Sequence, residues 1–160
     1  MAKPELSAIH STFVVERSYP KPPARVFAAF ADPAQKRRWF AESETRDLNH
    51  YEMDFQVSGA EVTRGVLNKQ TPVAGMEMVT VSTYHDIVPD KRIVQTQLMA
   101  MNGKLVSVAL ITFELLRTET GTDLICTHQA TFFEGADGPN RREHGWNALL
   151  DKLGAQLAAA

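Results

Sequence analysis

The sequence predicts an α+β protein in which a curved antiparallel sheet of about seven strands wraps around one long C-terminal helix. Three observations support this fold class. An amphipathic stretch closes the chain at residues 140–157, a long region rich in β-branched and aromatic residues precedes it, and two short helical signals follow the first strand. Strands joined by short loops must pair antiparallel. The concave face of such a sheet then requires the apolar side of the long helix.

The C-terminal stretch has the spacing of a helix with one apolar side. Its large apolar residues recur at intervals of three and four, which places them on a single stripe. These residues are Trp146, Leu149, Leu150, Leu153 and Leu157. Asn140 and Glu143 fit a capping box, in which each side chain accepts from the backbone N–H of the other. We therefore expect the helix to begin at Asn140.

One strand and two short helices precede the sheet region. Alternating apolar residues predict a strand over residues 11–19. The prolines that follow suit the first turn of a helix, and apolar residues at helical spacing continue to residue 30. Asp32 as N-cap and Pro33 as first residue predict a second short helix that ends near residue 38.

Residues 42–133 have the composition of strands interrupted by turns. Residues 45–55 are predicted to form two strands that turn near Asn49-His50. The following strands are expected over residues 61–66, 76–88, 92–101, 104–116 and 122–133. Asn102-Gly103 is the strongest hairpin signal, because both residues accept a positive φ.

The length and composition limit the class of protein. A chain of 160 residues, 44% of them apolar, fits one domain over residues 11–158, and residues 1–10 are expected to form a disordered tail. A net charge of −2 leaves no basic surplus for nucleic acid. No apolar run approaches the roughly 20 residues of a membrane helix, and no signal-peptide core is present. The lone Cys126 suits a reducing compartment. We expect a cytoplasmic protein that binds neither nucleic acid nor membranes, and the sequence leaves open whether it forms a homodimer.

Several landmarks occur in the order found in a known group of proteins. They are Pro-Ala-Arg-Val-Phe at 23–27, Asp32-Pro33 with Trp39-Phe40, Ile-Val-Pro-Asp-Lys-Arg-Ile at 87–93, Gly121-Thr122, and Gly145-Trp146 ahead of 149–153. This order resembles the START-like (SRPBCC, birch-pollen-allergen-like) superfamily and, within it, the activator of heat-shock protein 90 ATPase homologue-like family. The resemblance implies a helix-grip fold. The superfamily includes lipid carriers, polyketide cyclases, antibiotic-resistance proteins and co-chaperone domains, so its activity does not follow from the fold.

The favoured function is binding of a small apolar or amphipathic ligand in a cavity between the sheet and the C-terminal helix, with neither metal nor organic cofactor. A fully packed interior is the alternative. Gln95 and Gln97 share a strand face with Met99, whose flexible thioether suits a ligand of variable shape, although ordinary core packing also explains it. His128 is a candidate polar contact or else a satisfied or solvent-facing histidine. Arg142 is a candidate anion contact at the cavity mouth or else a solvated arginine.

The predicted ligand-binding residues are Trp39, Phe40, Tyr84, Gln95, Gln97, Met99, His128, Arg142 and Trp146. Trp39 and Phe40 are expected to close one end of the cavity, because large rings after a short helix need burial.

Two other functions are weighed against ligand binding. A polyketide-cyclase or hydrolase-like enzyme would use His128, Tyr84 and Arg142 to orient a substrate, but the sequence offers no acid–base pair, and no catalytic residue is predicted. Cys126 and His128 lie two apart in a strand, about 6–7 Å from each other, too far for a nucleophile and its base. The scattered histidines predict no metal site. A chaperone-interacting module is the third alternative, but no motif in the chain supports it.

Overall fold

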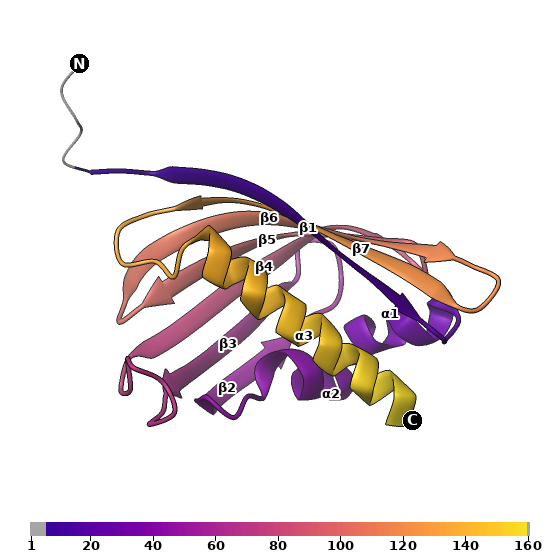
Figure 1. Ribbon diagram of the computed structural model, residues 1–160, viewed down its shortest axis with the longest axis horizontal. Coiled ribbons are helices and arrows are strands. Elements are labelled where there is room, and N and C mark those ends of the chain that lie inside the picture. Colours follow the sequence, from indigo (N-terminus) through magenta and orange to yellow (C-terminus); the bar gives the residue numbers. More distant parts are fainter. Residues whose placement is uncertain (1–5, 160) are drawn as a thin grey trace, which may run out of the picture.

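The computed structural model describes residues 6–159 and has the predicted helix-grip architecture. One seven-stranded antiparallel sheet has the strand order β1-β7-β6-β5-β4-β3-β2. Helix α3 (Pro139–Ala159) crosses its concave side, and α1 (Pro23–Ala31) and α2 (Pro33–Lys36) gather beside the C-terminal half of α3 (Figure 1). The sheet and α3 therefore enclose the core from opposite sides.

The strands follow one another as hairpins from β2 to β7. Their bounds are β1 (Ile9–Tyr19), β2 (Arg46–Met53), β3 (Ala60–Leu67), β4 (Glu77–Val88), β5 (Arg92–Met101), β6 (Lys104–Arg117) and β7 (Thr122–Phe132). The predicted Asn102-Gly103 turn joins β5 to β6, with φ of 50° and 78° at its two residues. β1 pairs with β7, so the first and last strands of the chain are neighbours (Figure 1).

Two predictions about strands are wrong in detail. β1 begins at Ile9, so the last residues of the expected tail belong to the sheet, and the Ser7 backbone N–H already donates to the Glu134 carboxylate at 2.6 Å. Residues 1–5 lie outside the described part of the chain. Residues 46–53 form the single strand β2 instead of two strands with a turn near Asn49-His50. Asn49 forms a bulge between Leu48 and His50, which both pair with β3.

The helix ends also differ from the prediction. The second short helix does not end near residue 38; it continues into η1 (Arg37–Ala41), a π-helical turn that carries Trp39 and Phe40 into the core. The Asp32 cap is as predicted, since its carboxylate accepts from the Ala34 backbone N–H at 2.9 Å. Helix α3 begins at Pro139, so Asn140 lies inside the first turn and the expected capping box is wrong. Proline suits this first position because its missing N–H has no helical partner there.

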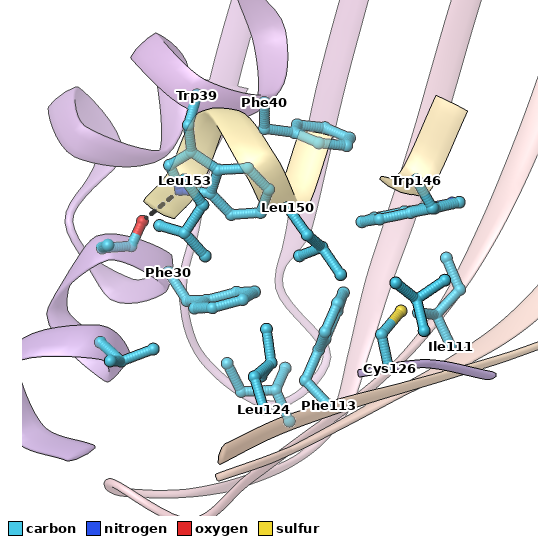
Figure 2. Close-up of a cluster of buried hydrophobic side chains, with 14 of the residues drawn as sticks. Phe30, Trp39, Phe40, Ile111, Phe113, Leu124, Cys126, Trp146, Leu150 and Leu153 are labelled. Atoms are coloured by element: carbon cyan, nitrogen blue, oxygen red, sulfur yellow. Dashed lines mark hydrogen bonds between the residues drawn. The ribbon is translucent and has the colours of Figure 1, made fainter. Parts of the chain in front are cut away.

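The core lies between the concave face of the sheet and the apolar stripe of α3. Figure 2 shows Phe30 of α1, Phe113 of β6 and Leu150 of α3 around a common centre. The predicted stripe is buried at Trp146, Leu150, Leu153 and Leu157, whereas Leu149 is only partly buried.

Trp39 is fully buried, and its indole Nε1 donates to the Ala29 carbonyl at 2.8 Å (Figure 2). Replacing Trp39 with alanine removes the whole ring and should lower the free energy of unfolding by about 3–5 kcal/mol. Denaturant unfolding followed by circular dichroism measures the loss. The exposed Leu98 provides a control, because Leu98→Ala should cost much less. Equal losses for the two variants would contradict the buried position of Trp39.

A buried ion pair joins the short helices to the sheet. Lys36 Nζ lies 3.0 Å from Glu61 Oε1, and the two side chains are only 2% and 1% exposed. The hydroxyls of Tyr51 and Tyr84 donate to the same carboxylate at 2.6 and 3.3 Å. The Lys36 ammonium also lies within 5.7 Å of three ring centroids, those of Phe30, Trp39 and Phe40. The Glu61 carboxylate thus accepts from three donors. The Lys36 ammonium has a counter-ion and makes cation–π contacts with the surrounding rings.

Removing one partner of this pair leaves the other charge buried alone. Lys36→Met and Glu61→Gln should each lower the free energy of unfolding by about 3–5 kcal/mol. The double variant should lose clearly less than the sum of the two, because no uncompensated charge remains. Denaturant unfolding of the three variants tests this expectation, and strictly additive losses would show that the two charges are not coupled.

Candidate functional site

A groove of about 710 Å³ lies between α3, the end of η1 and the part of the sheet formed by β4 and β5. Its floor consists of Met78, Thr80, Gln97 and Met99. These four side chains share the concave face because Thr80 pairs with Met99 in the β4–β5 register. The volume falls within the roughly 300–1,000 Å³ of small-molecule sites.

Aromatic rings form one wall of the groove. Trp146 of α3 and Phe40 of η1 both line it, with ring centroids 6.0 Å apart and an interplanar angle of 28°. The ring centroids of Trp146 and Phe113 are 5.6 Å apart, so the inner face of the Trp146 ring packs in the core. Figure 2 shows Trp146 beyond Leu150 on the same helix, with Phe40 facing it from the short helices. The wall is therefore apolar and held by the core behind it.

The concave face of β5 carries two buried amides, as the shared strand face of Gln95 and Gln97 predicts. Both Nε2 groups donate to the Ser82 hydroxyl at 3.3 Å. Gln97 lines the groove, whereas Gln95 lies farther along β5 and outside it. Within residues 6–159, Gln95 Oε1 has no hydrogen-bond partner. The strand face that carries Gln95 and Gln97 points into the protein, and only part of this face borders the groove.

Arg142 lines the groove but is neither solvated nor unpaired. Its side chain is 6% exposed, and its Nε and Nη2 each donate to an Asp137 carboxylate oxygen at 2.8 Å. Nη2 also donates to the Ser107 hydroxyl at 2.9 Å, and the guanidinium lies 5.0 Å from the centroid of the Phe132 ring. This fork-to-fork pair shows that Arg142 is not a solvated arginine. Its Nη1 has no hydrogen-bond partner within residues 6–159, and an anion contact by Arg142 stays a prediction.

His128 is fully buried and does not line the groove. Its ring stacks on Phe13 with centroids 4.5 Å apart, and neither ring nitrogen has a partner among the described residues. Burial first, and then the positive charge of Arg142, lower its pKa to about 4. His128 is therefore neutral at pH 7, and it is neither satisfied nor solvent-facing, the two alternatives to a ligand contact.

The structure divides the nine predicted ligand-binding residues into two groups. Phe40, Gln97, Met99, Arg142 and Trp146 line the groove, whereas Trp39, Tyr84, Gln95 and His128 do not. The second group is engaged in the core, since Tyr84 bonds to Glu61 and Trp39 to Ala29. Whether any of the nine contacts a ligand stays a prediction.

Sequence reasoning missed two basic residues at the rim. Arg46 begins β2 and donates to the Ala41 carbonyl, and Lys152 of α3 donates to the Glu42 carbonyl. Arg46 lies in residues 45–55, which are predicted to form two strands that turn near Asn49-His50. Lys152 is not among the apolar residues of the predicted stripe, so a charged side chain there is expected to face water. The available signal was its position three residues after Leu149, which is on the stripe.

No group of three metal-binding side chains converges anywhere in residues 6–159. Cys126 is buried, and burial raises the pKa of its thiol to about 12. A thiol in this environment is unreactive.

The fold and the groove place the protein in the START-like class, in which a curved antiparallel sheet holds a C-terminal helix. A family model described as Activator of Hsp90 ATPase homolog 1-like protein matches residues 20–158. The chain belongs to this family, and the predicted membership is confirmed.

Solved structures agree with this assignment. A protein from Rhizobium leguminosarum is 32% identical with a TM-score of 0.88, covering 97% of this chain and 99% of that chain. A protein from Rhizobium loti is 41% identical with a TM-score of 0.84, covering 94% and 99%. An AHSA1-like protein from Aeromonas hydrophila, 18% identical with a TM-score of 0.68 and covering 93% of each chain, shares the fold. No curated protein matches the chain.

None of the helices in the described part of the chain combines the length and the apolarity needed to cross a membrane.

The low pKa of His128 predicts a dependence of stability on pH. Between about pH 6.5 and 4, His128 is protonated in the unfolded chain but stays neutral in the folded protein. The free energy of unfolding should therefore fall as the pH is lowered through this window. Denaturant midpoints measured across the window test this. The matched variant His128→Leu should lose this part of the pH dependence. An unchanged slope in the variant would mean that other groups cause it.

Proposed function

We propose that the protein binds a small amphipathic molecule in the groove between α3 and the sheet. One observation carries the proposal: an aromatic wall of Phe40 and Trp146 stands beside a floor that includes the buried amide of Gln97 and the hydroxyl of Thr80. A ligand with an apolar body and polar substituents matches both surfaces. Small-molecule sites commonly combine a mainly apolar lining with a few fixed polar groups.

The thioethers of the floor support a binding function. Met78 and Met99 both line the groove, and unbranched thioethers adapt their shape to different apolar partners. Leu149, which also lines the groove, is only partly buried although it belongs to the apolar stripe of α3. Apolar surface that the core leaves uncovered is thus available to a ligand.

The positions of the polar residues favour binding over the enzymatic alternative. Of the three residues that would orient a substrate, Tyr84 and His128 lie outside the groove, and Arg142 is held by Asp137. The name of the family model refers to activation of a chaperone ATPase. Ligand binding remains our proposal for this chain, because the groove is the feature that supports a function.

Native mass spectrometry of freshly purified protein tests the proposal directly. A mass above that of the chain, lost on denaturation, would reveal a retained small molecule and allow it to be identified.

Trp146 should report occupancy of the groove, because its ring lines it. In a Trp39→Phe background Trp146 is the remaining tryptophan, and its emission should change saturably when a fatty acid, an aromatic polyketide or a hydrophobic dye is added. A Trp146→Phe variant, titrated in parallel, provides the control for the Trp39 signal. Tight binding by calorimetry with unaltered Trp146 emission would place the site elsewhere and refute this function.

A further inference from the structure

Two positively charged side chains meet at one rim of the groove. Arg46 reaches it from β2 and Lys152 from α3. Their hydrogen bonds go to consecutive backbone carbonyls at the end of η1, those of Ala41 and Glu42. Two elements far apart in the sequence thus place two cations at the same short segment.

Neither cation has a carboxylate partner within residues 6–159. Burial lowers the pKa of Arg46, and its buried Nε has no acceptor in the described part of the chain. The nearby Glu42 carboxylate is engaged by Arg37 Nε at 3.1 Å, and Glu44 is exposed at the rim. A partly buried guanidinium without a counter-ion is costly unless an anion compensates it.

The backbone of β3 makes room for Arg46. A Cβ at Gly65 would lie 2.7 Å from Cγ and 2.8 Å from Cδ of the Arg46 side chain, closer than such atoms approach. The arginine stem therefore lies directly against this glycine. A Cβ at position 65 would force Arg46 to shift from this path, and it would also lie 2.8 Å from the Asp47 carbonyl oxygen.

We propose that the ligand of the groove is an amphipathic anion whose carboxylate or phosphate group binds between Arg46 and Lys152. This inference rests on the proposed function and specifies its ligand class. The head group would accept from the guanidinium of Arg46 and from the Lys152 ammonium, and charge-assisted bonds of this kind are the strong ones. The apolar body lies along Phe40, Trp146 and Leu149, which line the same groove. We place the head group at Arg46 and Lys152 and not at Arg142, because Asp137 already compensates the charge of Arg142.

Calorimetric titration with decanoate, decyl phosphate and 1-decanol tests the inference, since the three probes share an apolar chain and differ in the head group. The wild-type protein should bind at least one of the two anions roughly tenfold or more tightly than the alcohol. The ratio between decanoate and decyl phosphate distinguishes a carboxylate from a phosphate ligand.

Variants locate the head-group site. Arg46→Met and Lys152→Met should each remove most of the preference for the anion and leave 1-decanol binding unchanged. Arg141→Met is the matched control, because Arg141 is an exposed cation that lines the same groove. It should change anion binding by less than about threefold, because Arg141 is not one of the two cations that bond to the Ala41 and Glu42 carbonyls. Arg46→Lys keeps the charge and should retain part of the preference.

Each outcome decides the inference. Equal binding of anions and alcohol by the wild-type protein overturns the anion site and leaves the proposed function standing. The anion site is also overturned if Arg141→Met loses as much anion binding as Lys152→Met. Lys152 is exposed, so misfolding would not explain a loss of binding in its variant. If no probe binds and the Trp146 titration also finds no ligand, both proposals fail.

Discussion

Packing of the apolar stripe of α3 against the concave sheet determines where every other part of the molecule can lie. Along the C-terminal half of α3, α1 and η1 complete the enclosure and supply Phe30 and Trp39 to the core. Toward the other end the helix presents small residues, Gly145 and Ala148, and these line the groove. Trp146 and Leu149 line it as well, so the groove borders both small and large side chains of α3.

The buried Lys36–Glu61 pair connects the core to this groove. Glu61 belongs to β3, and Lys36 ends α2 immediately before η1, so the ion pair fixes the turn from which Phe40 extends. The Lys36 ammonium lies 4.7 Å from the centroid of the Phe40 ring, and Phe40 also lines the groove. An interaction inside the protein therefore sets the position of an aromatic wall that faces a candidate ligand.

Much of the fold could be predicted because its signals are local. The spacing of the α3 stripe, the Asp32 cap and the Asn102-Gly103 turn each depend on a few neighbouring residues. Strand alternation likewise indicated that Gln95 and Gln97 share a face, and both are buried. The π-helical turn at Arg37–Ala41 was missed, because it depends on what the two aromatic rings contact in the folded protein.

The candidate site was harder to predict because it depends on contacts between distant elements. Alternation indicates which side a strand residue faces, but it does not indicate how far α3 extends over that side. Gln97 therefore borders the groove and Gln95 does not. The pairing of Arg142 with Asp137 required the path of the loop before α3, and the rim cations Arg46 and Lys152 meet only in the folded chain.

The pairing of β1 with β7 has a consequence for how the protein forms during synthesis. His10 and Thr131, for example, are partners 121 positions apart, so the first strand leaves the ribosome long before its neighbour β7 exists. Closing so long a loop is entropically costly and slow. Until then β1 is an unpaired strand with alternating apolar residues, which is the kind of segment that associates with other chains or with chaperones. The nascent chain should therefore be most vulnerable to aggregation before β7 and α3 have emerged.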